Sequence, residues 1–341
     1  MTRALIVRAA APGVSIQDAG RPGFLAFGLS RGGAVDRLAL SEGAALLRQS
    51  EDLAAIELGE MGGEFEATED MRIALTGAAM QAAIDGAQIA WNASHMLPSG
   101  STLKIGAARE GRYGYLHVGG GVEVDERLGS RSTHFAAHLG GSVHAGEHLL
   151  VGSDAGTSVG QTFDPSPRFS GGTIRVVPSL QTEFFSPDQL KRFQATEFKR
   201  DARGNRMGVP LRQDGPGFQS SAGLSVLSEV VIPGDIQITG DGTPFVLLCE
   251  CQTTGGYPRI ASVIPADLPR VAQAPAGAAL RFEFVSIDDA VDIEARTKAQ
   301  AGALPQTLRP LVRDPRDMPD LLAFNLISGA TTGTFSSEDN T

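Results

Sequence analysis

Short apolar runs separated by glycine-containing turns dominate the chain. Residues 4–9 (ALIVRA) have strand character, and residues 54–78 contain three strand-like segments joined by two turns. Three later phrases, at 97–106, 143–152 and 274–285, each place a glycine in a turn before an alternating apolar segment. This pattern is typical of β-barrels and β-sandwiches, so we expect a mainly β protein.

Helical spacing is confined to a few segments. Leucines and alanines follow Asp36 at helical spacing up to position 47, with Asp36 as the candidate N-cap. The phrase at 186–196 predicts a short helix that has Ser186 as its cap and a proline in its first turn. From Asp288 onward we expect one helix and then a poorly ordered end at 328–341.

A fixed offset relates the two halves of the chain. Glu57 and Glu229 are 172 residues apart, and so are Gly62 and Gly234. The segment between the two halves, at 153–172, consists mostly of Gly, Ser, Pro and Asp, which is typical of a linker. We therefore predict two related all-β halves, whose most natural ligand site is the cleft between them.

Composition and charge exclude several classes of protein. With 29 Lys and Arg against 39 Asp and Glu, the 341-residue chain has a net charge of −10, which disfavours binding to nucleic acid or an anionic membrane. The apolar run at the N-terminus is interrupted by Arg8, and no stretch reaches the length of a membrane span. We expect a cytoplasmic protein. The two cysteines, Cys249 and Cys251, are interpreted as small buried residues on one side of a strand.

The main candidate site is the stretch QTTGGYPRIASVI at 252–264. It predicts a strand, a flexible Gly-Gly bend and a second strand, with five polar groups around the bend. Those groups, Gln252, Thr253, Thr254, Tyr257 and Arg259, suit a small amide, carboxylate or phosphate. The alternative is a tight turn with ordinary polar residues.

Two other loops are weaker candidates. Asn205 and Arg206 lie in a glycine-containing turn and could orient a planar amide or carboxylate, or could simply cap that turn. The phrase LGSRSTH at 128–134 places Arg131 among hydroxyl groups, although a helix N-terminus with a Ser or Thr cap is the simpler account.

The histidines do not predict a metal site. All six lie between positions 95 and 148, and HAGEH at 144–148 formally matches a zinc motif. That motif requires a helix, whereas Gly146 is expected in a turn before a strand.

Seven ordered phrases between about residue 4 and residue 286 resemble the biotin-dependent carboxyltransferase-like family, which includes the C subunit of bacterial 5-oxoprolinase and the carboxyltransferase part of urea amidolyase. They are SIQDAGRPGF, GLSRGGAVDRLAL, RIALTGA, LGSRST, NRMGVPL, SEVVIPGDIQI and QTTGGYPRIA. The chain departs from the usual family pattern at Pro210, where an Arg is common, and at Val230, where Gly is usual.

The resemblance implies a fold of two cyclophilin-like β-barrel domains with a few short helices. The domains are expected at 1–160 and 173–287, followed by a helical and partly disordered tail at 288–341. The matched motifs suggest catalytic residues Asn205, Arg206, Gln252 and Thr253, substrate-binding residues Asp36, Arg131, Thr254, Tyr257 and Arg259, and no metal.

The resemblance also implies an activity that needs partners. A KipI-like protein (the B subunit) and a LamB/YcsF-type protein (the A subunit) are expected to join this chain in opening 5-oxo-L-proline to L-glutamate, with ATP and Mg²⁺ in the complex. Biotin is not expected on this chain. Two alternatives stay open: a carboxyltransferase component that acts on urea or a related amide with carboxybiotin, and a non-catalytic regulator that binds a KipI-like protein.

Overall fold

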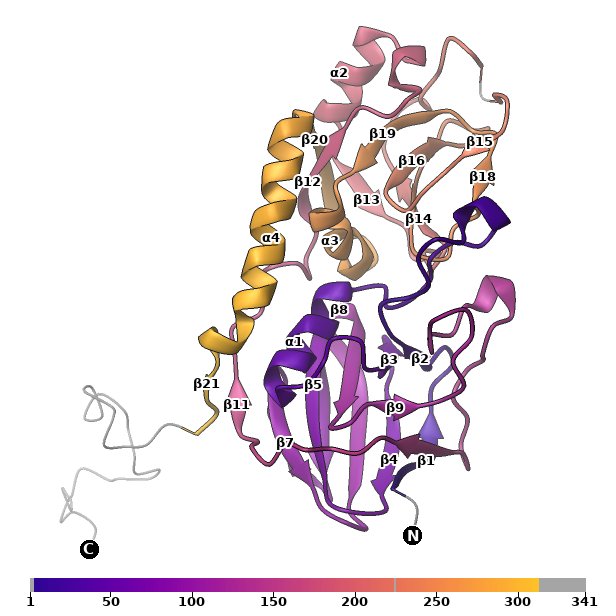
Figure 1. Ribbon diagram of the computed structural model, residues 1–341. Coiled ribbons are helices and arrows are strands. Elements are labelled where there is room, and N and C mark those ends of the chain that lie inside the picture. The colour runs from indigo at the N-terminus through magenta and orange to yellow at the C-terminus, as the bar shows by residue number, and fades with distance from the viewer. Residues whose placement is uncertain (1–2, 224, 313–341) are drawn as a thin grey trace, which may run out of the picture.

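Two β units lie one above the other, and a long C-terminal helix runs along one side of both (Figure 1). The computed structural model describes residues 3–223 and 225–312. Strands make up most of the regular structure, which confirms the predicted mainly β fold class. The expected disordered end at 328–341 lies outside the described residues.

The N-terminal unit is built on a twelve-stranded sheet. Its central path runs β21-β11-β7-β5-β8-β4-β1-β10-β9, while β2 and β3 join beside β8 and β6 joins β5. The strands are β1 (Ala4–Ala10), β2 (Ser15–Gln17), β3 (Ala55–Gly59), β4 (Gly63–Ala67), β5 (Met71–Ile84), β6 (Ala87–Gln88), β7 (Ala93–Leu97), β8 (Thr102–Val118), β9 (Val122–Glu123), β10 (His148–Val151), β11 (Gln161–Thr162) and β21 (Arg309–Pro310).

The two longest strands, β5 and β8, form the centre of this sheet. Their antiparallel register shifts after Gly77, where the backbone has a φ of 72°. A Cβ at Gly77 would lie 2.5 Å from the Tyr113 carbonyl oxygen, so only glycine fits this irregularity.

The C-terminal unit is a closed seven-stranded barrel in the order β12-β19-β16-β17-β14-β13-β20. Its strands are β12 (Gly172–Val177), β13 (Phe198–Arg200), β14 (Gly208–Arg212), β16 (Asp235–Ile238), β17 (Pro244–Leu247), β19 (Arg259–Val263) and β20 (Ala279–Phe284); a separate pair, β15 (Glu229–Val230) and β18 (Thr254–Gly255), lies beside it. Four phenylalanines pack inside, with Phe193 ring centroids 5.0–5.8 Å from those of Phe198, Phe218 and Phe282.

The described part of the chain also contains four α-helices: α1 (Arg37–Leu47), α2 (Pro187–Ala195), α3 (Leu268–Gln273) and α4 (Ile287–Thr307). The predicted cap of α2 is confirmed, because the Ser186 hydroxyl accepts a hydrogen bond from the Gln189 amide. Asp36 does occupy the N-cap position of α1, but its side chain makes no capping hydrogen bond and has other partners.

The barrel core continues into the N-terminal unit. Val35, Leu40, Tyr113 and Tyr115 belong to the same buried cluster as the barrel phenylalanines. The segment at 153–172, which was predicted as a linker, is also part of the folded structure, since it contains β11 and its Arg168 is only 3% exposed. The two units therefore share an interior.

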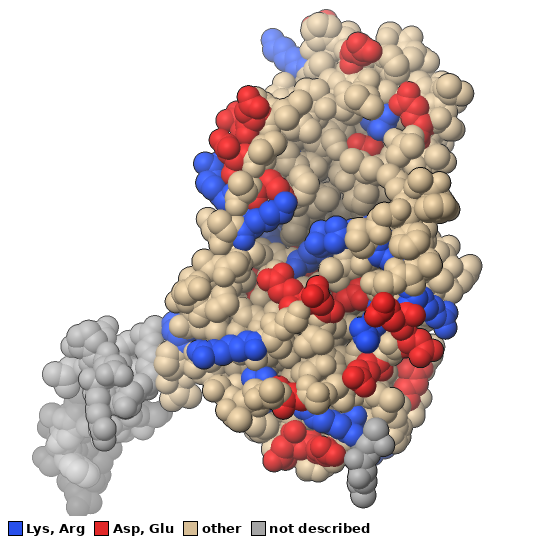
Figure 2. Space-filling model, viewed as in Figure 1, with Lys and Arg blue, Asp and Glu red and all other residues tan. Residues whose placement is uncertain are grey.

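Charged side chains of both signs gather over the N-terminal unit (Figure 2). Above them, the surface is hollowed on the side of the barrel that faces the viewer, and the floor of this hollow is largely uncharged. No helix among the described residues is both long and apolar enough to cross a bilayer.

Candidate functional site

Arg206, a predicted catalytic residue, lies at the boundary between the two units. It precedes β14 in a turn closed by hydrogen bonds between Asn205 and Gly208. Its guanidinium is buried, donating to Glu250 Oε1 at 2.5 Å, to Glu57 Oε1 and to the Gly33 carbonyl at 2.6 Å. Glu57 and Gly33 belong to the N-terminal unit and Glu250 to the C-terminal one. The side chain thus bridges the units, and all three of its nitrogens have partners.

Glu57 extends this network into the N-terminal unit. Its Oε2 accepts hydrogen bonds from the Tyr115 hydroxyl at 2.7 Å and the Val35 amide at 2.9 Å. The Tyr115 oxygen in turn accepts from the Asp36 amide at 2.9 Å. Burial, followed by the charge of Glu57, raises the pKa of Tyr115, so this hydroxyl stays protonated and donates.

Asp36, a predicted substrate-binding residue, is fully buried in a second part of the interface. Its Oδ2 accepts from Arg168 Nε at 2.7 Å and from Gln273 Nε2 at 2.8 Å. The same Arg168 makes two hydrogen bonds to the Glu42 carboxylate, at 2.8 and 2.7 Å. Gln273 also accepts from the Tyr113 amide at 2.9 Å. Residues from α1, the connecting segment, α3 and β8 meet here.

A further polar group in the interface is His134. Its Nε2 lies 2.9 Å from the Ser30 hydroxyl, and its Nδ1 accepts from the Ala137 amide at 3.2 Å. That contact makes His134 the cap of a short 3-10 turn, Phe135–Ala137, where a Ser- or Thr-capped helix was expected. Burial lowers the pKa of His134, although Glu250 at 3.8 Å opposes this. The ring is therefore neutral at pH 7.

The cysteines lie beyond the strand on which they were expected, because β17 ends at Leu247. Both thiols are free. Burial raises the pKa of each of them to about 12. As interpreted from the sequence, neither has the low pKa of a nucleophilic thiolate.

Several predicted site residues lie along the rim of the barrel, near the boundary. Asn205, Gln252, Thr254 and Tyr257 are exposed and Thr253 is half-buried. The Glu250 amide donates to the Arg206 carbonyl at 3.0 Å, which places 205–206 beside 250–252. Gln252 donates to Gln237 Oε1 at 3.0 Å. The structure thus places the loops at 205–206 and 250–252 side by side.

Arg259, by contrast, anchors the β15–β18 pair to the barrel. Its guanidinium is 7% exposed and donates to Glu229 at 2.6 Å and to the Val230 carbonyl at 2.9 Å. Arg259 Nη1 also lies 3.3 Å from an Asp235 carboxylate oxygen. These partners leave Arg259 in a positioning role in this structure.

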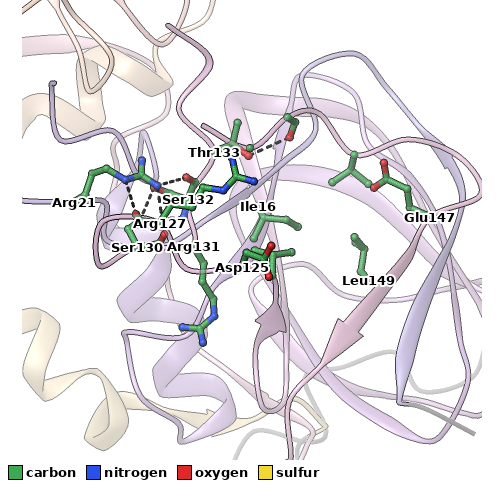
Figure 3. Close-up of a pocket in the computed structure, with 14 residues that line it drawn as sticks. Ile16, Arg21, Asp125, Arg127, Ser130, Arg131, Ser132, Thr133, Glu147 and Leu149 are labelled. Atoms are coloured by element: carbon green, nitrogen blue, oxygen red, sulfur yellow. Dashed lines mark hydrogen bonds between the residues drawn. The ribbon is translucent and has the colours of Figure 1, made fainter. Parts of the chain in front are cut away.

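Arg131 lines a separate pocket of about 230 Å³ in the N-terminal unit (Figure 3). Its amide donates to Asp18 Oδ2 at 2.6 Å, and its side chain lies 3.6 Å from Glu126. Buried hydroxyl groups of Ser130, Ser132 and Thr133 line the same wall, which shows that the polar character of LGSRSTH belongs to a cavity.

Several interface residues have no counterpart in the predicted site. Glu57 stands out in the sequence only through its offset of 172 residues from Glu229, and Arg168 lies in the segment predicted as a linker. Glu250, Gln273 and Tyr115 carry no local motif. A buried polar residue between apolar neighbours, such as Glu57 in AIELG, was the one available signal.

The histidine motif adopts the predicted turn. Gly146 has a φ of 90°, and β10 begins at His148. Within residues 3–223 and 225–312, no group of His, Cys, Asp and Glu side chains is arranged to hold a metal ion.

The comparisons with known proteins agree with this architecture. Residues 27–284 match the family model described as the carboxyltransferase domain, subdomains A and B. A crystal structure of the Kluyveromyces lactis urea amidolyase superposes with a TM-score of 0.79 at 24% identity, over 92% of this chain and 21% of that one. The protein therefore belongs to the carboxyltransferase domain family, as its motifs suggest.

Within the family, the match to this chain spans almost the full length of two bacterial relatives. The chain is 33% identical to the C subunit of 5-oxoprolinase from Haemophilus influenzae, over 83% of this chain and 92% of the relative. It is 32% identical to the Escherichia coli protein of the same name, over 81% and 90%. A solved chain designated TTHA0988 superposes with a TM-score of 0.75 at 28% identity over 84% of this chain, which spans 56% of that longer chain.

Proposed function

We propose that this chain is the C subunit of an ATP-dependent 5-oxoprolinase. The observation that carries the proposal is the near-complete coverage of two relatives with that name, at 33% and 32% identity. The urea amidolyase of Saccharomyces cerevisiae is 27% identical, and the match spans only 16% of that protein.

In this proposal the chain works with two partners, a KipI-like B subunit plus an A subunit of the LamB/YcsF type. ATP with Mg²⁺, bound in the complex, would phosphorylate the lactam oxygen, because an amide carbonyl is a poor electrophile. Water would then attack C5, phosphate would leave, and the C5–N bond would break with the nitrogen taking up a proton. The paired loops at 205–206 and 250–252 supply hydrogen-bonding groups at the rim of the barrel. Asn205, Gln252 and Thr253 are our candidates for contact with the reacting amide, with Thr254 and Tyr257 beside them.

The test is reconstitution from the three purified proteins. We expect 5-oxoproline-dependent release of ADP and glutamate when all three are present, and neither product when this chain is omitted. A folded, assembled mixture that releases neither would refute the proposal.

The other family activity, carboxyl transfer from carboxybiotin, can be distinguished from 5-oxoproline hydrolysis in the same preparation. It requires a biotinylated protein, which avidin detects, and bicarbonate-dependent ADP release with urea. A regulator without catalytic function would bind a KipI-like protein equally well after Gln252→Ala, whereas in our proposal this change lowers turnover of the assembled complex.

A further inference from the structure

Gln237 is a buried polar residue between the barrel and the β15–β18 pair. Ile236 and Ile238 belong to the barrel core, so Gln237, which lies between them on β16, faces the outside of the barrel. It is nevertheless only 2% exposed. Gly255 of β18 lies against it, since a Cβ on that glycine would be 2.3 Å from Gln237 Nε2. The strand pair therefore shields this side chain from solvent.

The side chain of Gln237 makes a single hydrogen bond within the described part of the chain. Its Oε1 accepts from Gln252 Nε2 at 3.0 Å, whereas its own Nε2 is buried without a partner. A buried donor without a partner lowers stability, and an apolar side chain of similar shape would leave no such group. Glutamine at this position is therefore better explained by its contact with Gln252 than by the stability of the fold.

This contact determines which atom of Gln252 a ligand can use. Gln252 is exposed at the rim of the barrel, in a loop that we assign to the reacting amide. Its Nε2 is engaged by Gln237, while its Oε1 has no partner among the described residues. An amide oxygen accepts hydrogen bonds, and the ring nitrogen of a lactam carries one N–H that can donate. The orientation of Gln252 thus suits recognition of the lactam nitrogen.

We propose that Gln237 is a positioning residue, which holds the Gln252 amide with its oxygen free to accept the N–H of the lactam ring. The identity of the ligand rests on the proposed function, which this inference deepens. Gln237 does not itself touch the substrate, because it is buried beneath β18.

Kinetics of the reconstituted complex and urea denaturation of the chain test the proposal together. Gln237→Met should lower kcat/KM for 5-oxoproline about tenfold, because the Gln252 amide is no longer held. The free energy of unfolding should stay unchanged or rise, since no buried group is left unpaired. A purely structural role predicts the reverse, lower stability with unchanged kcat/KM. Gln213→Met is the control in the same barrel: Gln213 donates to the Pro216 carbonyl at the surface, and its loss should change neither quantity.

A double-mutant cycle shows whether Gln237 acts through Gln252. The double variant Gln237→Met with Gln252→Ala should be no less active than Gln252→Ala alone. The wild-type complex should discriminate against N-methyl-5-oxoproline, whose ring nitrogen has no proton, and this discrimination should fall in each variant. Additive losses in the cycle, or equal discrimination in wild type and Gln252→Ala, would overturn the proposal.

Failure of this inference and failure of the proposed function are distinguishable. NMR relaxation of the glutamine side-chain amides in the isotopically labelled chain reports the order of the Gln252 amide without any turnover. Gln252 should be ordered in wild type and mobile in Gln237→Met. If it is so but the reconstituted complex is inactive, the positioning role stands and the ligand falls with the proposed function. If the complex is active but Gln252 is equally mobile in both proteins, the positioning role is wrong and the function stands.

Discussion

At the scale of single residues, Arg206 shows how a motif residue can have a structural task. Its partners Glu57 and Glu250 are 1% and 2% exposed, so neither carboxylate has water as a substitute partner. Removing one member of a buried ion pair is much more costly than removing an exposed one.

We therefore expect Arg206→Met to lower the free energy of unfolding by about 3–5 kcal/mol, measured by urea denaturation. Arg203→Met is the matched control in the same loop. The Arg203 side chain is 78% exposed, so water screens its pair with Asp201 and the substitution should have little effect on stability. Equal stability of the two variants would show that Arg206 does not hold the units together and would return it to the list of catalytic candidates.

His117 gives the protein a defined response to acid. Its ring is buried, and Nε2 lies 2.8 Å from the Thr76 hydroxyl, which donates to the Ala39 carbonyl. Burial lowers the pKa of His117 from 6.5 to about 3. The unfolded chain therefore takes up this proton first, so the contribution to stability is complete above pH 6.5 and is lost as pH falls toward 3.

Between pH 6 and pH 4, His117 should contribute a loss of about 1.4 kcal/mol per pH unit to the free energy of unfolding. His117→Gln keeps a hydrogen-bond donor and removes the titration. Urea denaturation at several pH values should show a shallower acid dependence for this variant. Identical slopes would mean that the folded protein can protonate the ring.

At the scale of elements, α1 contains a glycine, Gly43, that helix propensity alone would disfavour. A Cβ on Gly43 would lie 2.3 Å from atoms of the His117 ring, so α1 can approach β8 only with glycine there. In an isolated helix, alanine would be more stable than glycine by about 1 kcal/mol.

Gly43→Ala should therefore destabilise the protein despite its better helix propensity. In a His117→Ala background the same change should be neutral or stabilising by up to about 1 kcal/mol. Urea denaturation of the four proteins gives the double-mutant cycle. Destabilisation of similar size in both backgrounds would show that the His117 ring is not what excludes a Cβ at position 43.

The sequence predicts most elements of this fold because their signals are local. The first strand, the start of α1 at Arg37 and the cap of α2 all follow from nearby residues. The offset of 172 residues also has a structural counterpart, since β4 begins at Gly63 and β16 at Asp235. Pairing is not local, however: β4 lies between β1 and β8, whereas β16 pairs with β17 and β19. Spacing along the chain could not reveal that difference.

The candidate site was predictable only in part, for a similar reason. Glycine-rich turns mark the loops at 205–206 and 252–257, and the hydrogen bond from the Glu250 amide to the Arg206 carbonyl places the residue just before the second loop beside the first loop. Whether a polar side chain faces a ligand or a buried partner depends on residues far along the chain. Arg206 and Glu57 are separated by 149 positions, and Arg168 and Asp36 by 132. No motif records such pairs.

At the scale of the whole molecule, the two β units form one body. Arg206, Arg168 and Gln273 cross their boundary, and Val35 and Tyr115 join the core of the barrel. This continuity fixes the rim loops of the barrel relative to the N-terminal pocket. We infer that partner proteins meet a preformed surface rather than two independently moving domains.

The central claim is that this chain is a required part of an enzyme that couples ATP cleavage to the opening of 5-oxoproline. The most direct measurement is the ratio of glutamate to ADP released by the reconstituted complex, with and without this chain. The account predicts equal amounts of both products when all three proteins are present, and no glutamate when this chain is left out. Undiminished glutamate release without it would contradict the claim.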